Sequence, residues 1–260
     1  MGVGRALRDS APAAAAIVAF LAVWQLATVV WDIPLWLLPS PKAITLALWE
    51  GRVWLLGHLG VTLYETVVGF LLGVVVGIPL AALLVSSDLI WRTLYPILAA
   101  VQSIPKTAVA PLLLVWLGAG ELPKVIIAFL IAFFPIVVNT ATGMTLVEQD
   151  LLHLVRSLSG TKMQTFWHIR LPNALPHIFS ACKVAVTLAV VGAVIGEFVG
   201  ADRGLGYIIL VASSQLKTDV AFVAILLLAA LGMALFWAVS VVERWLLPWC
   251  GPQRERIVQA

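Results

Sequence analysis

Residues 148–176 read EQDLLHLVRSLSGTKMQTFWHIRLPNALP and lie between two long apolar runs. In a chain this hydrophobic, they form the one stretch suited to contact water or a soluble partner. A Ser159-Gly160 pair interrupts the stretch near its middle, and Leu171-Pro172 follows towards its end. The pattern predicts two short amphipathic helices, the second of which ends at Leu171-Pro172 because proline cannot continue a regular helix.

Each predicted helix in this stretch has an apolar face. In the first, apolar residues recur at i, i+3, i+4 and i+7, namely Leu151, Leu154, Val155 and Leu158. The second predicted helix has a similar apolar face, formed by Met163, Phe166, Trp167 and Ile169. Such a face has to lie against another surface. The segment is therefore either an interfacial linker on lipid headgroups or a docking element for a soluble protein, and we favour the docking element.

The composition places the chain in a membrane. Hydrophobic residues make up 62% of the 260 residues and charged residues only 11%, too few for the surface of a soluble domain. We expect an all-α, polytopic membrane protein with a single transmembrane domain over residues 1–260 and a core at 58–247. A spanning helix needs about 20 apolar residues. The predicted spans, six in number, lie near 11–31, 60–86, 92–117, 123–145, 177–199 and 220–247.

The distribution of Lys and Arg predicts that both termini are cytoplasmic. The cations assigned to the cytoplasm are Arg5, Arg8, Arg92, Arg156, Lys162, Arg170, Lys183, Arg244, Arg254 and Arg256. Those assigned to the outside are Lys42, Arg52, Lys124, Arg203 and Lys217. Residues 148–176 are then cytoplasmic and residues 201–219 are outside. The net charge of +3 reflects this bias, and we expect no nucleic-acid partner.

Several chemistries are not supported by the sequence. It has no GxxxxGK[ST] phosphate loop and no Ser/His/Asp or zinc-protease pattern, so we expect no enzyme activity and no bound cofactor. Cys182 and Cys250 lack ligand-type neighbours, which predicts neither a disulfide nor a metal site. The histidines are scattered, and we expect them on the surface or in loops: His58, His153, His168 and His177.

Polar residues inside predicted spans are candidates for a solute pathway, because an ionisable group in a membrane is costly unless it is paired or hydrated. Glu65 is one such residue, although we find no convincing proton relay. Pro105 and Pro111 are expected to break the third span, which makes that span the expected pathway wall. The pathway candidates are Gln102, Ser103, Lys106, Asn139 and Glu197.

Two glycine series predict how the helices pack. Small residues at every fourth position let helix backbones approach closely inside a membrane. We favour packing within the bundle over a subunit interface or a sliding surface. The first series is Gly69, Gly73 and Gly77, and the second is Gly192, Gly196, Gly200 and Gly204.

Four stretches resemble the permease subunits of binding-protein-dependent ABC importers. Residues 156–172, RSLSGTKMQTFWHIRLP, are similar to that family's ATPase-docking motif. Residues 105–120, PKTAVAPLLLVWLGAG, and 133–143, FFPIVVNTATG, resemble the branch that serves taurine, sulfonates, nitrate and related solutes. Residues 191–210, VGAVIGEFVGADRGLGYIIL, look most like members assigned to thiamine-pyrimidine precursors or riboflavin.

The resemblance implies a bacterial inner-membrane complex of two permease copies as a homodimer, two ATP-binding subunits and an extracytoplasmic solute-binding protein. ATP hydrolysis would occur in the partner subunit. The motif departs from the family pattern, since His153-Leu154-Val155 replace Glu-Ala-Ala and Ser159 stands at the glycine position. The implied docking residues are Leu151, His153, Leu154, Val155, Arg156, Leu158, Ser159, Gly160, Phe166, Ile169, Leu171 and Pro172.

The sequence leaves alternatives open for the solute and for the class of protein. A pyrimidine precursor or riboflavin ranks first as solute, and a sulfonate, taurine or nitrate ranks second. A proton-coupled secondary transporter and a non-transporting membrane scaffold are the other classes. An ATPase and a solute-binding protein encoded beside this chain would identify an importer.

The topology can be tested with single cysteines placed at positions 161 and 214 of a variant without Cys182 and Cys250. An impermeant maleimide added to intact cells should label position 214 but not position 161, because the charge distribution puts residues 201–219 outside. After permeabilisation both should be labelled. Labelling at position 161 but not at position 214 in intact cells would show that the orientation is the opposite of the predicted one.

Overall fold

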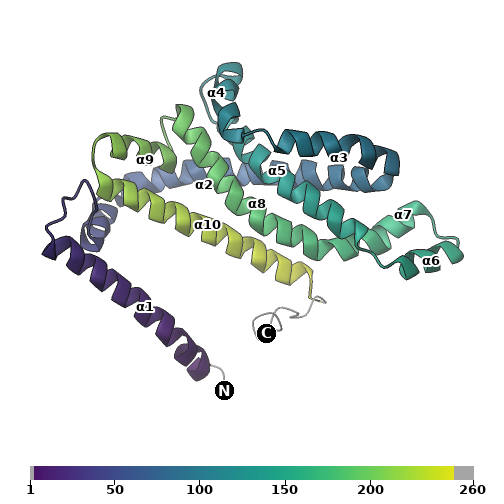
Figure 1. Cartoon of the computed structure of the whole chain (residues 1–260), viewed down its shortest axis with the longest axis horizontal. Helices are drawn as coiled ribbons and strands as arrows, with labels where there is room; N and C mark the ends of the chain where they lie inside the picture. The colour runs from purple at the N-terminus through teal and green to yellow at the C-terminus, as the bar shows by residue number, and fades with distance from the viewer. Residues whose placement is uncertain (1–2, 249–260) are drawn as a thin grey trace.

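The chain is a bundle of helices (Figure 1). The computed structural model describes residues 3–248, except for the side chains of residues 3–11, 13, 14, 88, 149 and 156. In chain order the elements are α1 (Val3–Val30), α2 (Pro41–Ser86), α3 (Asp88–Gln102), α4 (Lys106–Leu117), α5 (Leu122–Thr145), α6 (Gln149–Ser157), α7 (Lys162–Thr165), a π-helical turn (Phe166–Arg170), α8 (Leu171–Gly200), α9 (Leu205–Ser214) and α10 (Thr218–Leu246). The expected all-α class is confirmed over residues 3–248.

The centre of the bundle is formed where α5 packs against α2 and α8. Ala128 of α5 is fully buried there. A Cβ atom on Gly69 of α2 would lie 2.6 Å from the Cβ atom of Ala128, and one on Gly192 of α8 would lie 2.6 Å from its Cα atom. Both distances are shorter than atoms can approach, so glycine is required at both positions. The structure thus places members of both glycine series in contacts within the bundle.

The membrane-crossing helices differ in part from the predicted set. Within the part of the chain that the structure describes, four helical stretches are long and apolar enough to cross a membrane: Pro41–Ser86, Leu122–Thr145, Lys162–Gly200 and Thr218–Leu246. The predicted third span consists of Leu89–Gln102 and Lys106–Leu117, which meet at 89° and would count as a fifth crossing. Pro105 lies at this bend, but Pro111 is inside α4, so the expectation of a break at Pro111 is wrong. Ala15–Val30 is apolar but shorter.

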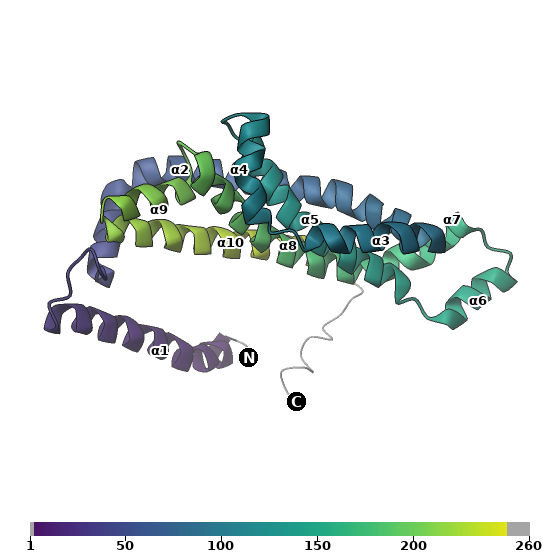
Figure 2. The ribbon, with the colours of Figure 1, turned by 45° about the horizontal axis from the view of Figure 1, so that its top comes forward.

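The connection between α1 and α2 is shorter than the loop predicted between the first two spans. Helix α2 begins at Pro41, well before the predicted start at residue 60, because Ser40 caps it and proline suits a first helical position. Helix α1 lies to one side of the bundle in both views (Figures 1 and 2). It contacts α10 through Trp24 and Phe222, whose ring centroids are 6.0 Å apart.

The 148–176 segment forms two helices around a break, as predicted. Helix α6 ends at Ser157, and Thr161 and Gln164 form a capping box that starts α7. The expected helix end at Leu171-Pro172 is wrong, since the chain runs on into α8. Here the Leu171 N–H bonds to the Phe166 carbonyl, five residues back. This wider π-helical turn accommodates the missing N–H of Pro172.

The two polar ends of the bundle are far apart. Helices α6 and α7 lie at one end, and α9 lies at the other, beside the start of α10 (Figure 1). Residues 201–219 were expected to form a loop, but α9 occupies much of this range. Which end faces the cytoplasm stays a prediction.

The central packing predicts that Gly192→Ala destabilises the protein. The added methyl group would clash with the backbone of Ala128, and overpacking of this kind costs about 1–3 kcal/mol. Thermal unfolding of purified protein in detergent should show a lower midpoint. Gly232→Ala is the matched control, because nothing lies within 4 Å of its added Cβ. Equal midpoints for the two variants would contradict this account.

Candidate functional site

The apolar face of α6 is not covered by the rest of the chain. Leu151, Leu154 and Leu158 are 45%, 55% and 73% exposed. Val155, the fourth member of the predicted stripe, is half-buried beside Gly160. Exposed leucines on a short polar helix at one end of the bundle form a surface suited to a partner. His153 and Ser159 are exposed as well, whereas the side chain of Arg156 lies outside the described residues.

The residues in the second half of the segment lie in two different environments. Met163 and Trp167 are 66% and 57% exposed. Phe166 and Leu171, by contrast, pack against a buried cluster of the bundle that includes Met144. Ile169 and Pro172 are half-buried. The predicted docking residues therefore form an exposed group on α6 and an anchoring group around the π-helical turn.

The turn between α6 and α7 differs from the geometry expected of a glycine hinge. The residue with positive φ is Ser159 (φ +56°), whereas Gly160 has an ordinary φ. The Gly160 N–H donates to the Val155 carbonyl at 2.9 Å. A Cβ atom on Gly160 would clash with the Val155 side chain. Gly160 is thus needed for close packing rather than for a left-handed conformation.

Two hydrogen bonds connect the segment to the bundle. The Arg170 guanidinium donates to the Val85 carbonyl at the end of α2, with an Nη1–O distance of 3.1 Å. The Asn173 amide donates to the Gly143 carbonyl of α5 at 3.3 Å. A displacement of the segment would therefore also move the ends of α2 and α5, to which these hydrogen bonds attach it.

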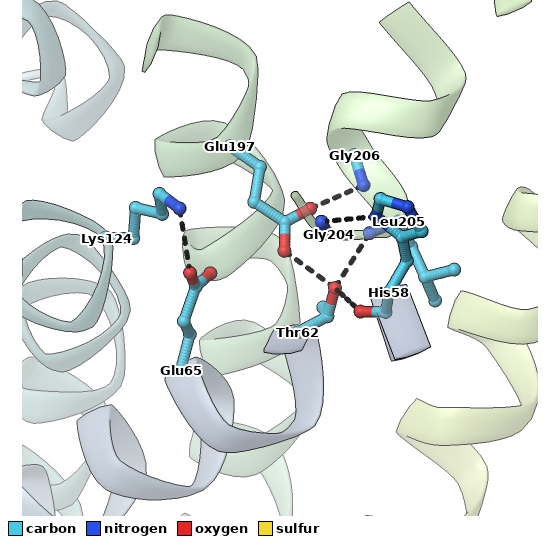
Figure 3. Close-up of polar contacts among 8 residues, drawn as sticks. All are labelled: His58, Thr62, Glu65, Lys124, Glu197, Gly204, Leu205 and Gly206. Carbon is cyan, nitrogen blue, oxygen red and sulfur yellow. Dashed lines mark hydrogen bonds and ion pairs between the residues drawn. The ribbon is translucent and has the colours of Figure 1, made fainter. Parts of the chain in front are cut away.

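A second group of functional candidates meets at the opposite end, near α9. Glu65 of α2 is fully buried and pairs with Lys124 of α5, with an Nζ–Oε1 distance of 3.1 Å (Figure 3). Lys124 was assigned to the outer side in the charge count, and that assignment stays a prediction; the structure shows that its side chain is buried. It lies in the first turn of α5, where its side chain packs over Gly196 of α8.

Glu197 of α8 binds the N-terminus of α9 (Figure 3). The Thr62 hydroxyl donates to Glu197 Oε1 at 2.6 Å, and the Gly206 N–H donates to Oε2 at 2.5 Å. The Leu205 N–H in turn donates to Thr62 Oγ1 at 2.9 Å. The first N–H groups of a helix lack partners within it and favour negative charge, so a buried carboxylate satisfies both needs.

His58 completes this cluster, although its role was not predicted from the sequence. Its Nδ1 atom accepts a hydrogen bond from the Gly204 N–H at 3.0 Å, and its ring stacks on Tyr207. The expectation of a scattered surface or loop histidine is wrong for this residue. A usable pattern was present, because His58, Thr62 and Glu65 recur at i, i+4 and i+7 and so share one face of α2.

The other pathway candidates do not meet Glu197. Gln102 and Ser103 are exposed at the bend between α3 and α4. Lys106 bonds to the Gln102 carbonyl and lies 4.9 Å from the centroid of the Phe134 ring. Asn139 is exposed and donates to the Pro135 carbonyl of its own helix at 2.8 Å. These residues occupy the α3–α4–α5 side of the bundle.

The remaining titratable groups of the described part of the chain do not gather into a metal site. Among the described residues, no group of three or more His, Cys, Asp or Glu side chains could hold a metal ion. Cys182 is buried and free, whereas Cys250 lies outside the described residues. Lys183, expected as a cytoplasmic cation, is buried in an ion pair with Glu243 that links α8 to α10. The predicted charge bias persists without Lys124 and Lys183.

The match to a family and the matches to individual proteins agree with one another. Residues 69–248 match the family described as binding-protein-dependent transport system inner membrane component. A formylaminopyrimidine transport permease protein of Halalkalibacterium halodurans is 35% identical over 88% of this chain and 92% of its own length. A riboflavin transport system permease protein of Chloroflexus aurantiacus is 33% identical over 88% of this chain and 86% of its own length. More distant relatives are named as sulfonate, taurine and nitrate permeases.

The fold also matches a solved structure. A chain in inward-facing crystal structures of the MetNI methionine ABC transporter superimposes with a TM-score of 0.65 and 25% identity. The match covers 75% of this chain and 97% of the other.

The hydrogen bonds of the Glu197 cluster predict that Thr62→Val is destabilising. The substitution keeps the shape of the side chain but leaves the Leu205 N–H and one carboxylate oxygen without a partner, which costs about 1–3 kcal/mol. Thr66→Val, one helical turn away, is the control, because the buried Thr66 hydroxyl has no hydrogen-bond partner among the described residues. Thermal unfolding should separate the two variants, and equal losses would argue against the cluster as a stabilising network.

Proposed function

Because the chain belongs to the family of binding-protein-dependent transport system inner membrane components, we propose that it forms the translocation pathway of an ABC importer whose ATPase docks on residues 148–176. The chain is a multi-pass membrane permease subunit for a small solute, and ATP hydrolysis lies in the partner subunit. The proposed assembly has two copies of this chain, two ATP-binding subunits and an extracytoplasmic solute-binding protein. The permease domain covers residues 1–260, with its core at 58–247.

The exposed face of α6 is the observation that carries the docking proposal. Leu151, Leu154 and Leu158 point away from the bundle, while the anchoring group around Phe166 packs on it. A linker that only joined two spans would not need both an exposed apolar group and an anchoring group. An apolar face presented by a firmly attached segment is what a soluble partner requires to move the membrane helices.

A continuous helix offers a route for that motion. The helical stretch Lys162–Gly200 contains 39 residues, which corresponds to a length of roughly 60 Å at the usual rise per residue. It begins in the docking segment and carries Glu197 near its other end. Movement of the segment by the ATPase would therefore reach the Glu197 cluster and α9 through one helix.

For the solute we propose an aromatic nitrogen heterocycle of the pyrimidine-precursor or flavin class. The relatives named for formylaminopyrimidine and riboflavin transport are 35% and 33% identical to this chain. The relatives named for sulfonate transport follow closely at 32%, and those named for taurine and nitrate are 29% and 26–30% identical. A sulfonate, taurine or nitrate is accordingly the second choice. Calorimetric titration of the associated solute-binding protein with both classes would decide between them.

Leu158→Glu tests the docking proposal directly. A carboxylate seated in an apolar groove of the ATPase would lose its hydration without a partner, at a cost on the order of several kcal/mol. We expect the variant to lose co-purification with the ATPase and to lose solute uptake at matched membrane expression. If the segment rested on lipid headgroups instead, the charge would cost only about 1 kcal/mol or less.

Leu216→Glu is the matched control for this experiment. Leu216 is similarly exposed but lies at the opposite end of the bundle, so its variant should retain the ATPase. Undiminished ATPase binding and uptake in Leu158→Glu would refute docking through this face. Accumulation of solute by the purified chain alone, driven by a proton gradient in liposomes, would favour a secondary transporter instead.

A further inference from the structure

A groove separates the docking segment from the end of the bundle. It has a volume of about 860 Å³, within the range of small-molecule sites. One wall is formed by the end of α2 and the start of α3, including Val85 and Leu89. The other wall is formed by the docking segment, including Leu152 and Phe166. The groove is therefore distinct from the exposed face of Leu151, Leu154 and Leu158, none of which lines it.

The lining of the groove combines apolar walls with positive charge. Lys162 and Arg170 are the ionisable residues among the described side chains that line it; the side chain of Asp88, between Ser87 and Leu89, lies outside the described residues. Arg170 is held at the wall by its hydrogen bond to the Val85 carbonyl. Neither cation takes part in the ion pairs found among the described residues. A ligand with a negative group and an apolar body complements such a lining.

The position of the groove identifies the source of that ligand. The apolar run of α2 gives way to Ser86 and Ser87 at the groove, and we place the edge of the membrane there on the basis of this change in polarity. Trp167, which is largely exposed, also lines the groove, and tryptophan is typical of membrane interfaces. A molecule entering the groove from this edge comes from the lipid leaflet.

We infer that this groove binds an anionic phospholipid, with its phosphate near Lys162 and Arg170 and its acyl part against Val85, Leu89 and Phe166. The bound lipid would fill the space between the end of α2 and the docking segment and so brace the segment against the bundle. The inference rests on the membrane location of the chain and not on ATPase docking. The two proposals can therefore fail separately.

The test measures lipid binding to the purified chain in detergent, without any ATPase. Native mass spectrometry during titration with phosphatidylglycerol and phosphatidylcholine gives the affinity for each lipid. We expect phosphatidylglycerol to bind more tightly. Lys162→Gln should weaken phosphatidylglycerol about fivefold, equivalent to about 1 kcal/mol for one interfacial cation, and leave phosphatidylcholine unchanged. Lys162→Glu should weaken it further.

Lys217→Gln is the matched control, because Lys217 is exposed at the opposite end of the bundle and its loss should not alter binding. Inorganic phosphate at the same concentration should not displace phosphatidylglycerol, since it cannot use the apolar walls; displacement would identify a free-anion site and overturn the proposal. Equal affinity for both lipids, or equal effects of Lys162→Gln and Lys217→Gln, would also overturn it. In a separate measurement on the complex with its ATPase, exclusion of the lipid together with cross-linking of Lys162 to an acidic segment of the ATPase would show that the groove is a protein interface and would overturn the proposal.

Discussion

Ala128 lies between Gly69 of α2 and Gly192 of α8, and this close contact of three backbones determines where the other helices can lie. A membrane offers no hydrophobic force between helices, so they associate through close packing and buried polar contacts. At one end, the same helices α2, α5 and α8 supply Glu65, Lys124 and Glu197. The polar cluster is possible only because small side chains let these helices approach.

The long helix from Lys162 to Gly200 joins the two functional regions. Its start lies in the polar docking segment, and its far part holds the carboxylate that binds α9. The π-helical turn before Pro172 keeps this helix continuous where a proline would ordinarily end it. In the proposed mechanism, docking at one end would be connected to the Glu197 cluster at the other by this single helix rather than by a chain of loops.

Sequence patterns located the docking segment better than the polar cluster. The periodic leucines of α6 and the Ser159-Gly160 break depend on neighbours within one or two turns, so they were readable directly. The burial of Lys124 could not be predicted, because an isolated lysine near a span end has the same local pattern whether it is exposed or buried. His58 was missed for the same reason, since its partner Gly204 is 146 residues away.

By itself the sequence determined the helical class, the apolar spans in outline, the family and the polar segment between the fourth and fifth predicted spans, because composition, periodicity and motif similarity are properties of the chain. The tertiary structure decided which polar residues meet, which leucines remain uncovered and where a groove opens beside Lys162 and Arg170. These properties depend on how helices from distant parts of the chain pack together, and pairwise contacts over such separations leave no local pattern in a single sequence.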